Sequence, residues 1–132
     1  MRGSCLCQRI VYEVRQLDSS IGHCSCPSCR KAHSAAFNTF AKVKHKHFQW
    51  VRGIELLSSF ESSPGKKRHF CSQCGTQLIA QLANEDHVIL RIGSLDDDPG
   101  VAPSYQMWAS RQVPWLKYGD NIIKYPEWEP GH

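Results

Sequence analysis

Seven cysteines in three short groups constrain this chain more than any other feature of its sequence. The groups read "CLC" at residues 5 to 7, "CSCPSC" at 24 to 29 and "CSQC" at 71 to 74. An odd number of cysteines fits poorly with a closed disulfide framework. In a reducing compartment, clustered thiols indicate metal binding or catalysis. We therefore consider the cysteines as metal ligands.

The length of 132 residues predicts a single domain, residues 1–132, with a real but not large core. The opening residues "MRGSCLCQRIVYEV" lack the apolar run that a signal peptide needs. No stretch reaches the ~18 consecutive apolar residues of a membrane-spanning helix. These features predict a cytoplasmic protein with reduced cysteines and no membrane association.

The formal net charge is +4, and part of it lies in "KVKHKH" at 42–47 and "GKKRH" at 65–69. Such stretches can attract a small acidic substrate or a phosphate backbone. The simpler expectation is a solvated loop face. Few aromatic residues are interleaved with the basic ones, so a nucleic-acid partner is not expected.

Turn residues divide the chain into short runs with strand-like composition. The expected strands cover residues 9–14, 37–43, 47–51, 55–60, 76–82, 87–93 and 104–110. A single short helix is expected near residues 29–37. Many short strands at this spacing predict a mainly β fold of short antiparallel strands with at most one short helix. The tail, residues 119–132, is expected to pack on the sheet or to lie at its periphery.

The "CSQCG" motif predicts a zinc knuckle, in which Cys71 and Cys74 bind one ion across a tight turn. Gly75 permits the positive φ that closes such a turn. Cys5 and Cys7 lie two apart on an expected strand, so their side chains point the same way. They can supply the other two ligands of a closed structural site.

Cys24, Cys26 and Cys29 can hold zinc with one coordination position open, which is typical of a catalytic zinc. A histidine in that position would make the site structural. His33 lies four residues after Cys29, and His69 lies two residues before Cys71. The spacing alone leaves the open and the closed site equally possible.

With these cysteine groups, the sequence resembles the glutathione-dependent formaldehyde-activating enzyme family, which includes the centromere-protein-V-like proteins. The resemblance runs from Gly3 to Trp115. It rests on several motifs: "GSCLC", "CSCPSCRK", "AAF", the Phe48, Trp50 and Gly53 pattern, "SSPGKKRHFCSQCG", "GSLDDDPG" and "VPW".

The resemblance implies a small zinc-built β-tent fold with two zinc ions per chain. It assigns the structural zinc to Cys5, Cys7, Cys71 and Cys74, and the catalytic zinc to Cys24, Cys26 and Cys29. Family members often carry His between the first two cysteines of the triple group, where this chain has Ser25. The three cysteine ligands are present despite this change, but the side chains around them that orient them differ from those of the family.

The implied reaction joins formaldehyde, or a similar small aldehyde, to a thiol such as glutathione, and is classed as a carbon–sulfur lyase activity. Arg68 is a candidate for holding a glutathione carboxylate, or for pairing with Asp96 or Asp97 as scaffold. Trp115 is a candidate for the pocket wall.

Two other functions remain open from the sequence. One is a binding module in which both zinc ions are structural. The other is a cysteine-based redox enzyme. Two zinc ions per chain would favour the enzyme or the binding module, and one zinc with reactive thiols would favour the redox enzyme.

Overall fold

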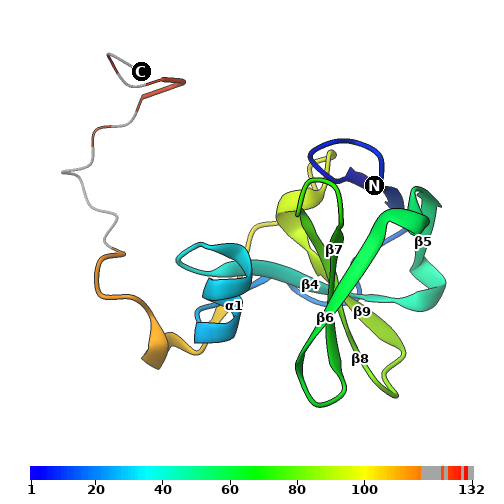
Figure 1. Ribbon diagram of the computed structural model, residues 1–132. Coiled ribbons are helices and arrows are strands. Elements are labelled where there is room, and N and C mark those ends of the chain that lie inside the picture. The colour runs from blue at the N-terminus through cyan, green and yellow to red at the C-terminus, as the bar shows by residue number, and fades with distance from the viewer. Residues whose placement is uncertain (117–122, 124, 129, 131–132) are drawn as a thin grey trace.

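The structure, a computed structural model, describes residues 1–116, 123, 125–128 and 130 (Figure 1). The strands in this part of the chain are β1 Arg2–Ser4, β2 Val11–Val14, β3 Gly22–Cys24, β4 Asn38–Lys44, β5 Phe48–Arg52, β6 Leu57–Ser63, β7 Lys66–Cys71, β8 Gln77–Leu82, β9 His87–Arg91 and β10 Tyr105–Met107. The helices are α1 Pro27–His33 and the 3-10 turns η1 His45–His47, η2 Ile54–Leu56, η3 Ile92–Ser94 and η4 Ala109–Arg111. The predicted mainly β fold with one short α-helix is confirmed.

The strands form two sheets. The smaller has the order β1-β2-β5, and the larger has the order β10-β3-β4-β9-β8-β7-β6. All pairings are antiparallel, as expected, except that β10 runs parallel to β3. Strands β4 to β9 lie between β3 and β10 in the sequence, and residues 95–104 lead from η3 to β10 at the edge of the larger sheet, next to β3.

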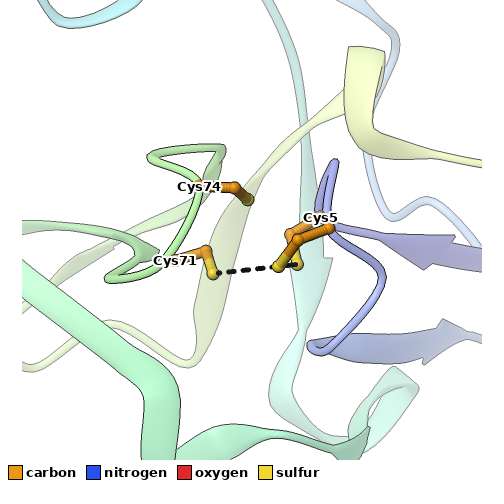
Figure 2. Close-up of side chains that lie close together, drawn as sticks. Cys5, Cys71 and Cys74 are labelled. Carbon is orange, nitrogen blue, oxygen red and sulfur yellow. Dashed lines mark hydrogen bonds between the residues drawn. The ribbon is translucent and has the colours of Figure 1, made fainter.

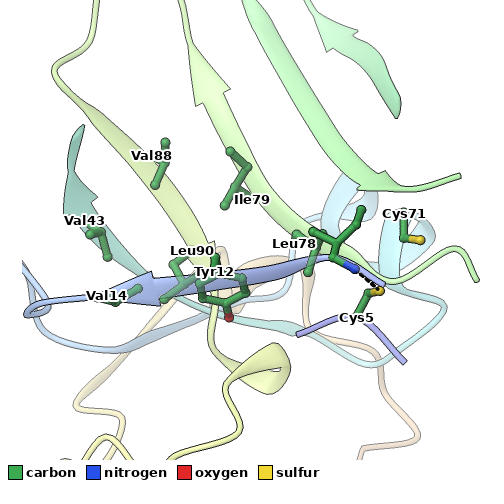
Figure 3. Packing of buried hydrophobic residues seen from close by; sticks show 10 residues of the cluster. Cys5, Tyr12, Val14, Val43, Cys71, Leu78, Ile79, Val88 and Leu90 are labelled. Atoms are coloured by element: carbon green, nitrogen blue, oxygen red, sulfur yellow. Dashed lines mark hydrogen bonds between the residues drawn. The ribbon is translucent and has the colours of Figure 1, made fainter. Parts of the chain in front are cut away.

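The main core lies where the two sheets face each other (Figure 3). The smaller sheet contributes Tyr12 and Val14, and the larger contributes Val43, Val88 and Leu90. Successive side chains of a strand point to opposite faces, so the alternate residues of β4 and β9 face away from this core. The larger sheet therefore has a second buried face, which carries the three-cysteine group described below.

Several local predictions were wrong. The lysines of the basic stretches are mostly exposed, as expected, but these stretches are not loops: residues 42–44 lie in β4, and β7 starts at Lys66. Arg68 within β7 is only 4% exposed. Cys5 and Cys7 do not lie on a strand, because β1 ends at Ser4 and the chain turns, with the Gln8 backbone N–H donating to the Cys5 carbonyl at 2.8 Å.

The helix α1 begins two residues before the expected range, because Cys26 caps it and Pro27 suits its first position. It ends where Ser34 takes a left-handed conformation, φ 47°. None of the helices that the structure describes is long and apolar enough to cross a membrane. The expectation for the tail, residues 119–132, falls mostly outside the described residues.

Candidate metal centres and their surroundings

The first cysteine cluster joins the turn after β1 to the turn after β7. The sulfur atoms of Cys5, Cys7, Cys71 and Cys74 all lie within 4.8 Å of one another. Figure 2 shows Cys5, Cys71 and Cys74 pointing into the same small space between the two turns. Cys5 and Cys71 are part of the main core, and Cys74 packs against it.

The spacing of these sulfurs suits zinc. Two ligands that are each about 2.3 Å from a tetrahedral zinc lie about 3.8 Å apart. The Cys5 and Cys7 sulfurs are 3.5 Å apart, and those of Cys7 and Cys71 are 3.8 Å apart. This donor set and geometry fit a closed tetrahedral thiolate site.

The backbone around the cluster is held by short contacts. Gly75 has φ 78°, and its N–H donates to the Cys71 carbonyl at 2.8 Å, so the predicted positive φ closes the knuckle. The Thr76 hydroxyl accepts the Leu6 N–H at 3.0 Å and thereby joins the two turns. The Ile10 N–H donates to the Cys5 sulfur at 3.3 Å, drawn as the dashed line in Figure 3.

The thiols of this cluster shift their pKa values in opposite directions. Desolvation opposes ionisation of Cys74, but hydrogen bonds from the Thr76 hydroxyl and backbone N–H lower its pKa to about 5. The Arg9 backbone N–H favours the Cys7 thiolate, yet desolvation and the neighbouring thiols raise the pKa of Cys7 to about 11. Four thiolates in so small a space repel one another, so a divalent cation is the charge that lets all four ionise together.

The second group, Cys24, Cys26 and Cys29, comes from one short segment between β3 and α1. Its sulfur atoms also lie within 4.8 Å of one another. Cys24 ends β3, and Cys26 is the N-cap of α1, where its sulfur accepts the Cys29 backbone N–H at 3.4 Å. The start of the helix thus brings the second and third sulfurs together.

This group lies on the second buried face of the larger sheet. Cys24 and Cys29 pack with Phe40, and Cys26 and Ile89 pack against them. Phe40 alternates with the core residues Ala41 and Val43 along β4, which explains why it points to the opposite face.

The ionisation of these thiols is also uneven. Burial raises the pKa of Cys24 to about 12. Burial opposes ionisation of Cys26 as well, but the Cys29 backbone N–H and the neighbouring thiols bring its pKa below the ordinary value. As in the first cluster, the donor set fits a divalent cation with an affinity for thiolates.

Arg68 contacts the second group directly. Its Nη1 and Nη2 atoms are both 3.9 Å from the Cys29 sulfur, and its Nε donates to the Ser62 hydroxyl at 2.9 Å. The alternative pairing with Asp96 or Asp97 is not found. Asp96 accepts the Ser4 hydroxyl, and Asp97 accepts the Arg2 backbone N–H. Arg68 is therefore a cation beside the three thiols.

Arg91 is the other buried cation on this face, and it was not predicted from the sequence. It is 4% exposed, and burial and the charge of Arg68 lower its pKa to about 10, with the thiols acting in the opposite direction. Lys66 is half-buried, and burial and Arg68 lower its pKa. The one signal in the sequence was a charged residue at the end of the apolar strand "HVILR".

Neither histidine that was considered as a fourth ligand belongs to the three-sulfur group. His33 is in the last turn of α1, and burial, with the charges of Arg91 and Arg68, lowers its pKa to about 4. His69 lines a surface hollow with Lys67 and Gln81 on the other face of β7 from Arg68.

Ser25, at the position where the resemblance leads one to expect His, is fully buried. Its hydroxyl accepts the Gln106 amide at 2.8 Å, and its backbone N–H donates to the Met107 carbonyl at 3.1 Å. The three-cysteine segment is therefore fastened to β10. Trp115 is 68% exposed and is not part of the apolar cluster around Cys24 and Cys29, so its role toward substrate stays a prediction.

Residues 1–111 match the family model described as glutathione-dependent formaldehyde-activating enzyme. In three dimensions the chain is similar to a Rhodobacter sphaeroides protein whose crystal structure is known, with a TM-score of 0.66. The similarity covers 81% of this chain and 100% of that one at 23% sequence identity. At this identity, the likeness shows a shared fold.

Proposed function

Since the chain belongs to the glutathione-dependent formaldehyde-activating enzyme family, we propose that it is a zinc-dependent enzyme that joins a thiol to formaldehyde or a similar small aldehyde. The thiol proposed is glutathione, the product is an S-hydroxymethyl adduct, and the reaction class is carbon–sulfur lyase. We further propose two zinc ions per chain and a cytoplasmic location.

The observation that carries this proposal is the grouping of Cys24, Cys26 and Cys29 without a fourth protein ligand among the described residues. Zinc held by three thiolates keeps one position for an exchangeable thiolate and promotes the loss of its proton. Cys5, Cys7, Cys71 and Cys74 would hold the other zinc as a closed structural site.

The surrounding side chains would favour an anionic sulfur next to the three cysteines. Arg68 and Arg91 supply two buried positive charges, and Lys66 supplies a third that is half-buried. These charges would stabilise the thiolate of an incoming thiol, which is the nucleophilic form. Phe40 and Ile89 supply an apolar wall that limits water around the reacting atoms.

Nuclear magnetic resonance of glutathione and formaldehyde at equilibrium tests the proposal, because exchange of the hydroxymethyl group broadens or transfers its signals. We expect zinc-loaded protein to accelerate this exchange and Cys26→Ser protein to leave it at the uncatalysed rate. The same spontaneous rate with and without the wild-type protein would refute the activity.

A binding module is the second candidate, and the four-cysteine cluster, two of whose members belong to the core, supports it. The two candidates differ in the state of the second metal. An exchangeable position would accept glutathione as a ligand, which a cobalt-substituted protein reports as a change in its thiolate absorption bands. Absorption bands that do not change on addition of millimolar glutathione would favour the binding module.

A further inference from the structure

Two side chains have buried hydrogen-bond donors without a partner on the face of the larger sheet that carries the three-cysteine group. Arg91 and Asn38 are each 4% exposed. The Nε and Nη2 atoms of Arg91 and the Nδ2 atom of Asn38 are inaccessible to solvent and have no hydrogen-bond partner. Most buried polar atoms in proteins are paired, because an unpaired one loses its hydrogen bonds to water without compensation.

The strand register places these donors around the cysteines. Asn38 on β4 lies directly opposite Cys24 on β3. Phe40, two residues further along β4, lies directly opposite Arg91 on β9. Residues opposite each other share a face of the sheet, and diagonal neighbours lie about 7–8 Å apart. Arg91 and Asn38 are thus diagonal neighbours on the face where Phe40 packs on Cys24 and Cys29.

No acidic side chain neutralises this face. Among the described residues, Arg68, Arg91 and Lys66 form no ion pair with a carboxylate. Arg68 already uses its donors on Ser62 and on the Cys29 sulfur. Lys66 is half-buried, and the Nε2 atom of His33 is also buried without a partner. The unpaired donors of Arg91 and Asn38 match a small group that carries negative oxygen.

We infer that Arg91 and Asn38 form a subsite for a small oxyanion beside Cys24, and that this subsite holds the aldehyde oxygen while it becomes an alkoxide. The role in the reaction rests on the proposed function. The thiol first releases its proton to solvent. Its thiolate sulfur then forms a bond to the aldehyde carbon, and the π electron pair of the C=O bond moves to oxygen. The resulting alkoxide accepts hydrogen bonds from the two side chains and takes a proton from water.

Preorganised donors at a developing oxyanion act strongly where water is excluded, and removing one such donor typically lowers kcat by a factor of about 100 to 1,000. The surroundings meet this condition, since Arg91, Asn38 and Phe40 are all buried. We therefore place Arg91 and Asn38 in the catalytic machinery and expect their loss to reduce kcat more than the affinity for the thiol.

Formate is the probe for the subsite, because it is a one-carbon oxyanion and its binding needs neither thiol nor turnover. Isothermal titration calorimetry on the zinc-loaded protein compares the wild type with Arg91→Gln, Arg91→Lys and Asn38→Leu. Arg15→Gln removes an exposed arginine next to β2 and serves as the charge-matched control. Zinc content and circular dichroism are measured for every variant.

We expect millimolar formate to bind the wild type and the control equally. Arg91→Gln should weaken binding by about tenfold or more, which corresponds to one lost charged hydrogen bond. Arg91→Lys and Asn38→Leu should show smaller losses, and they carry the test if Arg91→Gln does not fold. Equal formate affinity in the wild type and the folded variants, or no binding to the wild type, would overturn the subsite.

The outcome is separable from that of the proposed reaction. Formate binding that depends on Arg91, in a protein with no effect on glutathione and formaldehyde, would support the oxyanion subsite and refute the reaction. If the wild type accelerates hydroxymethyl exchange and Arg91→Gln accelerates it equally, the reaction is supported and the role of Arg91 in it is refuted.

Discussion

The two cysteine groups use the same side chain in opposite structural settings. The four-cysteine cluster joins two segments that are far apart in the sequence, since Cys7 and Cys71 are 64 positions apart. Two of its members are part of the main core. The three-cysteine group comes from six consecutive residues, 24–29, and lies on the opposite face of the larger sheet, beside Arg68 and Arg91.

This difference favours separate roles for the two proposed metals, one structural and one catalytic. A metal that links distant segments closes a long loop and substitutes for core that a small domain lacks. A metal bound within one short segment closes a small loop and adds little to global stability. Buried cations accompany the second group, where an anionic substrate group would bind.

Removal of one ligand from the first cluster should have the largest effect. Cys74→Ser should unfold the protein or make it insoluble, since zinc at such a site contributes on the order of 10 kcal/mol to folding. Ser72→Ala changes an exposed residue of the same turn and should melt like the wild type. Circular dichroism and zinc analysis check both variants. A Cys74→Ser protein with a wild-type melting curve would contradict the structural role.

Stepwise removal of metal should separate the two sites. A coloured zinc chelator of moderate affinity should first take one zinc per chain, while the far-ultraviolet circular dichroism stays unchanged and hydroxymethyl exchange is lost. A stronger chelator should take the second zinc together with the fold. Loss of structure in proportion to the first zinc removed would mean that both metals are structural.

Two glycines offer a matched comparison of the packing near each group. A Cβ on Gly3 would collide with the ring of Tyr12, which is fully buried and hydrogen-bonded to Ser94 at 2.7 Å. A Cβ on Gly22 would collide with Tyr105, which is 41% exposed and contacts Phe40 with the edge of its ring.

Gly3→Ala should therefore lower the free energy of unfolding by about 1–3 kcal/mol, the usual range for overpacking, and Gly22→Ala by less. Urea unfolding of both variants measures the difference. A larger loss for Gly22→Ala would show that the region of the three cysteines is the more rigid one.

Arg68→Lys should have the smallest effect on the fold. Lysine keeps the charge but loses the two guanidinium contacts to the Cys29 sulfur, so the affinity for the second zinc should fall by about tenfold. Chelator competition measures this affinity, and Lys67→Gln, an exposed neighbour, is the control. If the affinity for zinc at the three-cysteine group is unchanged, or if the affinity at the four-cysteine cluster falls instead, Arg68 does not stabilise the second site.

Much of the fold could be predicted because apolar runs and turn residues repeat along the chain. The strands β2, β8, β9 and β10 fall within expected ranges, and β4, β5 and β6 overlap theirs but extend one to three residues further. The strands β1 and β3 have three residues each, too few for a pattern. The strand β7 was missed because "KKRH" is basic, and charged residues are normally exposed. Arg68 is buried only because the sheet and the cysteine segment meet over it.

The cysteine groups could be predicted from their spacing, but their surroundings could not. Asn38 and Arg91 are 53 positions apart, and only the pairing of β4 with both β3 and β9 makes them neighbours. The parallel pairing of β10 with β3, which fastens Ser25, likewise depends on a long connection that has no local signature.

The most direct test of the division of work compares Cys26→Ser with Cys74→Ser by melting temperature and zinc content. We expect Cys26→Ser to stay folded, to melt within a few degrees of the wild type and to keep one zinc per chain while it loses hydroxymethyl exchange, and Cys74→Ser to lose its fold. If Cys26→Ser melts as poorly as Cys74→Ser, the three-cysteine group is structural. If Cys26→Ser is folded and fully active, the zinc-dependent reaction proposed for that group is wrong.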